Sequence, residues 1–317
     1  MKYYSKSILK YKKTSVLVAL VVFTLSLIIS PYYIDGDQVI YRKVFEELSS
    51  LNFIDGFSYF LLSTSSKEPG YYTITWIFSR FLEKDLFVSI LNAILAFYSM
   101  QLLIKWRASI YVAASIVLTN FYFYVLFFAA ERLKVSFMFL TIALLYVNGP
   151  KFYFFSMLSI ISHIQSLVIY VMLFFRATLI EFFRIIKSAK INKLFLLALI
   201  LLSIMLVLMS DQIITKFKSY AIMGFDIQVA YKMFIFYFMS LVYSRNKLET
   251  TILFIPLIIG VLMIGGTRIN MFGYFVFLYY ALPINKGFNI GVVLTSAYFL
   301  IKNIIFVHDI IVNGHGW

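Results

Sequence analysis

The sequence predicts an all-α, polytopic integral membrane protein with about nine to eleven transmembrane helices. Three observations predict this class. Apolar residues make up 62% of the 317 residues, only 13% are charged, and the mean hydropathy is +0.91. A chain of this length with so few polar groups cannot cover the surface of a soluble globule. Its apolar runs are also close to the length that crosses a bilayer.

Composition also excludes several classes of function. The chain has no cysteine, which excludes disulfide frameworks, thiolate zinc sites and cysteine nucleophiles. The net charge of +14 comes from cations scattered between apolar runs, so it indicates membrane topology rather than binding of nucleic acid. No Walker loop, dinucleotide-binding glycine motif or nucleophile elbow occurs. We therefore expect no cofactor and no nucleic-acid partner.

The first third of the chain combines an anchor with a polar segment. A lysine-rich start runs into an apolar helix at about 14–30, which we expect to be a membrane anchor with its lysines in the cytoplasm. Residues 31–84 mix acids, aromatics and Gly/Pro turns, and we expect an external, periplasmic cap with short amphipathic helices. Within it, Glu68-Pro69-Gly70-Tyr71 predicts a turn and a helix start, because proline favours the first helical position. Arg80 lies further along this helix.

Apolar runs predict the remaining spans at about 86–104, 109–128, 131–148, 194–210, 229–244, 250–266, 268–284 and 288–306. Residues 152–175 could form one tilted helix, or two half-helices that turn at Ser162 and His163. A single crossing would place the cations between 176 and 193 outside, against the positive-inside rule. We therefore predict a re-entrant helical hairpin, a second external loop at 211–228, and a single membrane domain over 1–317.

This topology collects polar residues of both signs on the outer side. They are Asp35, Asp37, Glu68, Arg80, Arg132, His163, Lys216, Lys218 and Arg268. Charged groups at membrane depth are costly unless they face a wet cavity or a partner. Arginine suits phosphate, because its planar guanidinium can donate two parallel hydrogen bonds. The pattern favours a site for a polar substrate presented from the outer leaflet.

Several of these residues also have a plain structural interpretation. Arg132 could anchor a helix end at the headgroups, and His163 could be a hydrogen-bonded packing residue. Glu68 could be an ordinary acid at a helix start. Glu131 and Lys134 are three residues apart on a helix, which favours local charge neutralisation.

Two further motifs, at Asp35-Gly36-Asp37 and at Arg268, could each indicate a ligand site. Asp35-Gly36-Asp37 has the form of a metal-phosphate motif, but we favour an ordinary turn and expect no metal site. Arg268 lies at a helix start, where the helix dipole opposes a cation, and this placement favours a compensating ligand.

The order of these motifs resembles a known family. Aspartates and Tyr41 in the first polar loop precede Glu68-Pro69-Gly70-Tyr71, Glu131-Arg132 opens a helix, and a GPK turn leads to IISHIQSL. Thr267-Arg268-Ile269-Asn270 then begins a helix that ends in Leu282-Pro283. Over about residues 30–285 this arrangement resembles the EpsG-like, Wzy-type polysaccharide polymerases of bacterial envelopes. One departure is Arg132-Leu133-Lys134, where such proteins often have Arg-Gln followed by small residues.

The resemblance implies a GT-C-like glycosyltransferase in the bacterial inner (cytoplasmic) membrane, with its active site facing the periplasm. Such an enzyme polymerises the repeat units of O-antigen or a related surface polysaccharide. The growing chain leaves its undecaprenyl diphosphate carrier and moves to the end sugar of a new lipid-linked unit. The implied partners are the undecaprenyl-diphosphate-linked oligosaccharide, the lipid bilayer and a chain-length regulator protein.

Roles follow from this chemistry. Arg132 and Arg268 would bind the diphosphate, His163 would act as the base or as a diphosphate contact, and Glu68 with Asp37 would hold the acceptor sugar. The full predicted set comprises the catalytic residues His163, Arg132, Arg268 and Glu68 and the substrate-binding residues Asp37, Arg80 and Tyr71. Three alternatives stay open: a lipid-linked oligosaccharide flippase, an O-antigen ligase or membrane acyltransferase of the same pathway, and a purely structural membrane protein.

Overall fold

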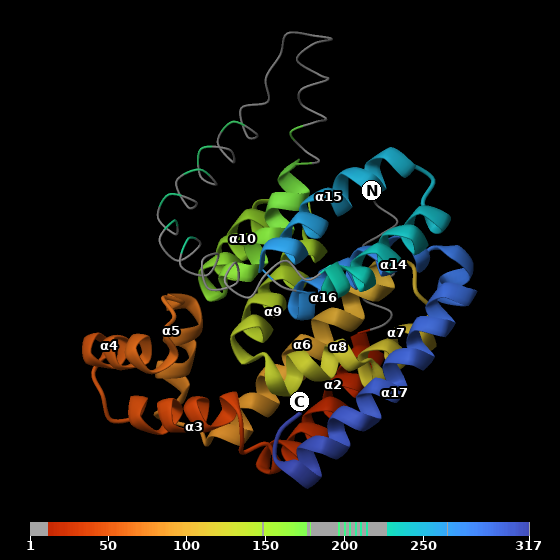
Figure 1. Ribbon diagram of the computed structural model, residues 1–317. Helices are drawn as coiled ribbons and strands as arrows, with labels where there is room; N and C mark the ends of the chain where they lie inside the picture. The colour runs from red at the N-terminus through yellow and green to blue at the C-terminus, as the bar shows by residue number, and fades with distance from the viewer. Residues whose placement is uncertain are drawn as a thin grey trace. The chain divides into compact units, whose positions relative to one another are not determined.

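The computed structural model describes residues 12–147, 149–175, 227–264 and 266–316, with isolated positions between 178 and 214. Every regular element in these ranges is a helix, which confirms the predicted all-helical class (Figure 1). The chain forms two compact units, one of Met1–Ser166 with Ala281–Trp317 and the other of Leu167–Tyr280. The predictions for 194–210, for the loop at 211–228 and for the cations between 176 and 193 lie almost entirely outside the described residues.

The first unit contains α2 (Lys12–Ile29), η1 (Ser30–Tyr32), α3 (Asp37–Leu48), α4 (Phe53–Thr64), α5 (Pro69–Phe78), α6 (Lys84–Lys105), α7 (Ile110–Thr119), α8 (Phe121–Tyr124), the π-helical turn η2 (Val125–Ala129), α9 (Glu131–Leu145), α10 (Pro150–Ser162), η3 (Ile164–Ser166), η4 (Ile284–Gly287) and α17 (Ile290–Asn313). The second contains α14 (Ile227–Tyr243), α15 (Lys247–Ile264) and α16 (Gly266–Ala281).

Three helical segments of the described chain are long and apolar enough to cross a membrane. They are Lys12–Tyr32, Lys84–Lys105 and Ile284–Asn313. A fourth is present if the bent pair Ile110–Thr119 and Phe121–Ala129 counts as one span. These segments include the apolar runs predicted at 14–30, 86–104 and 288–306.

Helices α2 and α6 pack together through polar contacts that fix their relative rotation. Asn92 donates to the Ser26 hydroxyl at 2.9 Å, and Gln101 donates to the Ser15 hydroxyl at 3.0 Å, so the two helices run antiparallel. All four side chains are buried. Between apolar helices, such side-chain hydrogen bonds act as specific attachment points.

Helices α3, α4 and α5 form the predicted cap segment and follow one another as three short helices (Figure 1). Gln38, Tyr41 and Phe45 are buried on one face of α3, at the three- and four-residue spacing of an amphipathic helix. Asn52 caps α4 by accepting hydrogen bonds from two backbone N–H groups of its first turn. Helix α5 begins at Pro69, as predicted, and the external location of the segment stays a prediction.

The span expected at 109–128 is broken in the middle. The chain bends by 54° between Ile110–Thr119 and Phe121–Ala129. Asn120 has an extended backbone at this point, and its side chain accepts a hydrogen bond from the N–H of Tyr122 at 2.9 Å. Asparagine competes with the helix for backbone hydrogen bonds, and here it ends one helix and begins the next.

Helices α9 and α10 approach each other closely. Ser136 and Ser159 exchange hydrogen bonds, each hydroxyl donating to the backbone carbonyl of the other residue. Helix α10 ends at Ser162, and His163 has an extended backbone with φ −161 and ψ 126. The helix break expected at Ser162 and His163 is therefore present, and it places the histidine at an irregular point of the backbone.

Candidate functional site

Glu68 is the centre of a buried cluster of charged residues. It occupies the N-cap position of α5 but makes no capping hydrogen bond with its side chain. Instead, its Oε2 accepts from Nη1 of Arg132 at 2.9 Å, and its Oε1 pairs with Nδ1 of His163. The carboxylate is 3% exposed. The interpretation of Glu68 as an ordinary acid at a helix start is therefore wrong, because its oxygens contact side chains from two other segments.

A glycine allows the first turn of α5 to approach the end of α10. An added Cβ at Gly70 would lie 2.6 Å from the Ser162 hydroxyl and 2.9 Å from the Ser162 backbone N and Cα. These separations are too short for any side chain, so only glycine permits this contact. Ser162 precedes His163 directly, and Gly70 follows Glu68 by two residues. The close approach therefore holds the carboxylate of Glu68 against the imidazole.

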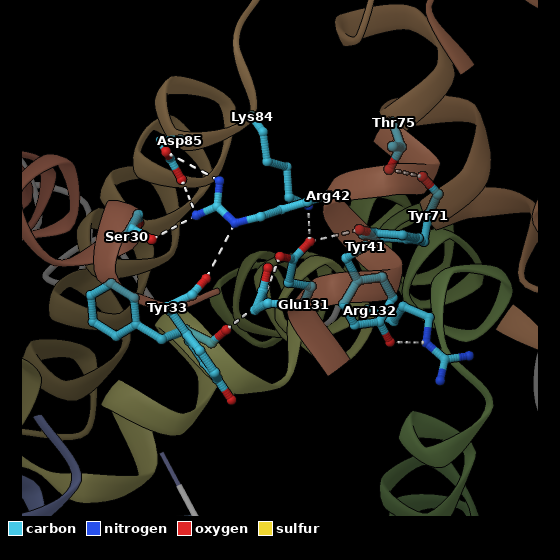
Figure 2. A network of polar contacts seen from close by, with 12 residues as sticks. Ser30, Tyr33, Tyr41, Arg42, Tyr71, Thr75, Lys84, Asp85, Glu131 and Arg132 are labelled. Atoms are coloured by element: carbon cyan, nitrogen blue, oxygen red, sulfur yellow. Dashed lines mark hydrogen bonds and ion pairs between the residues drawn. The ribbon is translucent and has the colours of Figure 1, made fainter. Parts of the chain in front are cut away.

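Arg132 joins this carboxylate to α3. Its Nε donates to the hydroxyl of Tyr41 at 2.8 Å, as Figure 2 shows, while its Nη1 donates to Glu68. Within the described chain, the third nitrogen, Nη2, makes no hydrogen bond. The side chain is only 13% exposed. A simple headgroup anchor would not be enclosed in this way, whereas a guanidinium whose Nη2 is unused can bind an anion.

The neighbouring residue, Glu131, forms a second buried carboxylate centre. Three side chains from three different helices donate to it. Lys84 donates at 2.5 Å and Tyr71 at 2.7 Å (Figure 2), and Gln38 donates at 2.8 Å. Lys134 acts on Glu131 electrostatically, as predicted, but it makes no hydrogen bond with it among the described residues. The lysine that bonds Glu131 comes from the first turn of α6, because tertiary packing brings that turn to the start of α9.

Two tyrosines connect the two carboxylate centres. Tyr41 accepts from Arg132, Tyr71 donates to Glu131, and the two rings meet edge to face with centroids 6.2 Å apart. Burial raises the pKa of Tyr41 and raises the pKa of Tyr71 well above its ordinary value. Both phenols therefore stay protonated at neutral pH. They act as fixed hydroxyl groups between the charged residues.

The cluster brings carboxylates and basic side chains together in a buried place. Two carboxylates, Glu68 and Glu131, lie among the side chains of Arg132, Lys84 and Lys134. Lys134 is 1% exposed, and its Nζ has no hydrogen-bond partner among the residues that the structure describes. An ammonium group without a partner in a buried position is costly. A buried basic side chain of this kind can bind an anion that enters the cluster.

The ionisation of Glu68 orients the histidine beside it. Burial alone would raise the pKa of the Glu68 carboxyl, but the neighbouring His163 and Arg132 lower it to about 2. Glu68 is therefore ionised at neutral pH and accepts a hydrogen bond from Nδ1 of His163. This contact orients the imidazole with Nε2 directed away from the carboxylate.

Three of the four predicted catalytic residues, Glu68, Arg132 and His163, thus meet in one cluster. The predicted substrate contact Tyr71 lies beside them on Glu131. Arg268 belongs to the second unit, in the first turn of α16, and its predicted role at the diphosphate stays a prediction. Lys216 and Lys218 lie outside the described residues.

The other two predicted substrate contacts lie at the edge of the cluster or away from it. Asp37 is exposed in the first turn of α3, one turn before Tyr41, and acts on that phenol electrostatically. Arg80 is not part of the cluster. Its guanidinium donates to the backbone carbonyls of Trp76 and Leu51 and stacks on the Trp76 ring at 3.6 Å, which ties the end of α5 to the turn before α4.

Sequence reasoning missed Lys84 and Gln38. Lys84 stands between Glu83 and Asp85, a pattern typical of an exposed helix start, and nothing local indicates that it is buried. Gln38 carried a weak signal, because it precedes Tyr41 by three residues and so shares its helix face. Over the described ranges, no group of three or more metal-binding side chains occurs, and Asp35-Gly36-Asp37 forms a bend in which Gly36 has φ 63.

Comparison with known proteins gives no match: no protein-family model, no curated protein and no solved structure is similar to this chain.

The arrangement supports a defined kind of chemistry. A histidine oriented by an ionised carboxylate can accept a proton from a hydroxyl group. A neighbouring arginine and a buried lysine without a hydrogen-bond partner in the described part of the chain can stabilise negative charge that develops beside it. The cluster can therefore combine base catalysis with stabilisation of an anionic leaving group.

Proposed function

We propose that this chain is a polytopic, GT-C-like membrane glycosyltransferase of the bacterial inner membrane. It would polymerise undecaprenyl-diphosphate-linked oligosaccharide repeat units of O-antigen or a related surface polysaccharide at the periplasmic face. The apolar helices of membrane length support the location. The resemblance to EpsG-like, Wzy-type polymerases supports the reaction, and it rests on the same residues, Glu68, Glu131, Arg132 and His163, that the structure gathers in one cluster.

The observation that carries this proposal is that one carboxylate, Glu68, holds both Arg132 and His163. In the proposed reaction, the imidazole takes the proton of the acceptor sugar hydroxyl as its oxygen attacks the anomeric carbon of the donor. The bond between that carbon and the diphosphate oxygen breaks, and its electron pair goes to the diphosphate. Arg132 stabilises the charge that develops there, with Nη2 as the donor still available.

The basic side chains around Glu131 support the same assignment. Lys134 and Lys84 both act electrostatically on Glu131 and repel each other. An incoming diphosphate would relieve this repulsion, since it brings negative charge to a poorly solvated place. A neutral sugar alone would not.

The test uses a strain that lacks the gene and receives wild-type or variant copies. Arg132→Ala and His163→Ala should abolish long surface polysaccharide on a gel and leave single repeat units attached to the surface lipid. Arg245→Ala is the matched control, because Arg245 is exposed in the turn between α14 and α15. Protein amounts are compared in isolated membranes.

Three outcomes separate the alternatives. Full-length polymer in both variants at normal protein amounts would overturn the proposal. Surface lipid that carries no repeat unit would indicate a flippase or a ligase instead. Unchanged polysaccharide in the strain without any copy of the gene would support an acyltransferase or a structural role.

A further inference from the structure

The backbone around His163 is fixed on both sides. The His163 N–H donates to the Ser159 carbonyl at 3.2 Å, and the hydroxyl of Ser166 donates to the His163 carbonyl at 2.8 Å. Nδ1 of the imidazole pairs with Glu68. The residue has therefore little freedom to rotate, and its chemistry depends on the second ring nitrogen, Nε2.

Among the residues that the structure describes, Nε2 has one hydrogen-bond contact, with the side chain of Gln165. The carboxamide oxygen of Gln165 lies 3.1 Å from Nε2. His163 is 3% exposed, whereas Gln165 is partly exposed. Gln165 belongs to the short turn η3 that directly follows the histidine. Any hydroxyl group that reaches Nε2 must take the place of this carboxamide.

A carboxamide suits a ring nitrogen that changes its protonation. While Glu68 holds the proton on Nδ1, the neutral imidazole has a lone pair at Nε2, which requires a donor, and the NH₂ end of glutamine provides one. After Nε2 has accepted a proton, it requires an acceptor, and the oxygen end provides that. Rotation of the amide by half a turn exchanges the two ends. An apolar or carboxylate side chain could serve only one of these states or neither.

We propose that Gln165 is a positioning residue for the base: its carboxamide holds Nε2 of His163 in either protonation state and yields this place to the acceptor hydroxyl. This inference rests on the proposed glycosyl transfer. The hydroxyl proton moves to Nε2, the acceptor oxygen bonds to the anomeric carbon, and the diphosphate leaves with the electron pair. The imidazolium then binds the oxygen end of Gln165 until its proton passes to water.

The contact can be tested without enzymatic activity. The chain contains only three histidines, so His308→Gln together with His315→Gln leaves His163 as the single imidazole signal in nitrogen-15 NMR of the full chain in nanodiscs. In this background, Gln165→Glu should raise the pH midpoint of the imidazole titration by about one unit or more, because a carboxylate favours the charged ring. The charged groups that face this ring are Glu68 and, bonded to the same carboxylate, Arg132 of α9.

A second variant covers the case in which the glutamate variant does not fold. Gln165→Asn keeps the amide but shortens its reach, so the Nε2 signal should shift while the Nδ1 signal stays in place. An unchanged midpoint in the glutamate variant, or an unchanged Nε2 signal in the asparagine variant, would overturn the assignment. These results do not depend on the reaction, so the NMR can support the contact even where the polysaccharide test removes the proposed function.

The role in the reaction has its own readout. Polymer formation by Gln165→Glu should fall at neutral pH and recover at higher pH, because the carboxylate keeps His163 protonated until the medium is more alkaline. Structural damage would instead lower polymer formation equally at all pH values. An equal loss across pH would therefore contradict a positioning role.

Discussion

Nη1 of Arg132 donates to Oε2 of Glu68 at 2.9 Å, although 64 residues separate the two along the chain. The contact joins the first turn of α9 to the segment before α5, and His163 approaches the other oxygen of the same carboxylate from the end of α10. One buried acid thus sets the geometry of a cation and a base. Stability and function should both depend on its ionisation.

The first prediction concerns Glu68 and pH. Its pKa in the folded protein, about 2, lies below its ordinary value of 4.5, so ionised Glu68 stabilises the fold above about pH 4.5. This contribution should decrease as pH falls from about 4.5 towards 2 and be lost at still lower pH. Thermal unfolding of wild type and Glu68→Gln from pH 7 to pH 3 measures this contribution of ionised Glu68 to stability. The difference between the two melting temperatures should be largest at neutral pH and should shrink below pH 4.5. A difference that stays constant would contradict the prediction.

The second prediction concerns the ion pair between Lys84 and Glu131. Both side chains are less than one-tenth exposed, and removal of one partner leaves the other charge buried, so Glu131→Gln should cost about 3 kcal/mol of unfolding free energy. The double variant Glu131→Gln with Lys84→Met should recover most of this loss. Chemical denaturation of wild type, the two single variants and the double variant gives the coupling free energy between Lys84 and Glu131.

The matched control for this cycle is the more exposed pair of Arg42 and Asp85, which lie 2.7 Å apart with side chains 24% and 29% exposed. Solvent screens such a pair, so Asp85→Asn with Arg42→Met should show a coupling of at most about 1 kcal/mol. Equal coupling in the two cycles would mean that burial does not distinguish the pairs.

Local sequence patterns predicted the helical segments better than the contacts between them. Pro69 predicted the start of α5, and apolar runs predicted α2, α6 and α17. Both signals depend only on residues that are close together in the sequence. The break at Asn120 was missed, although an asparagine inside an apolar run is a recognisable capping residue.

The sequence also predicted single residues of the candidate site, but not the contacts that join them. Arg132 and His163 were found because a charge inside an apolar run is conspicuous in the sequence. Their connection through Glu68 spans 64 and 95 residues, and no local pattern specifies it. Lys84 was missed because its acidic neighbours resemble an exposed helix start, and only tertiary packing buries it.

The third prediction concerns Lys134. Its ammonium is buried without a hydrogen-bond partner in the described part of the chain, so Lys134→Met should remove an unfavourable charge and keep the side-chain volume. The unfolding free energy should rise by about 1–3 kcal/mol, whereas polymer formation should fall because an attraction for the anionic donor is lost. Thermal unfolding and polysaccharide length are measured on the same preparations. Lower stability with unchanged polymer would show that Lys134 serves the fold alone.

The fourth prediction concerns Gly70, which lies in contact with Ser162. A methyl group there would overlap the backbone of Ser162, at 2.9 Å from its N and Cα, so α5 and α10 must separate in Gly70→Ala. Because Glu68 and His163 lie directly beside this contact, their pairing should weaken, and polymer formation should fall about tenfold or more. Gly149→Ala is the control, since the nearest neighbour of its added Cβ lies at an ordinary 3.6 Å. Ser162→Gly should not rescue Gly70→Ala, because the overlap with the backbone remains. Rescue by that change would show that only the serine hydroxyl requires the glycine.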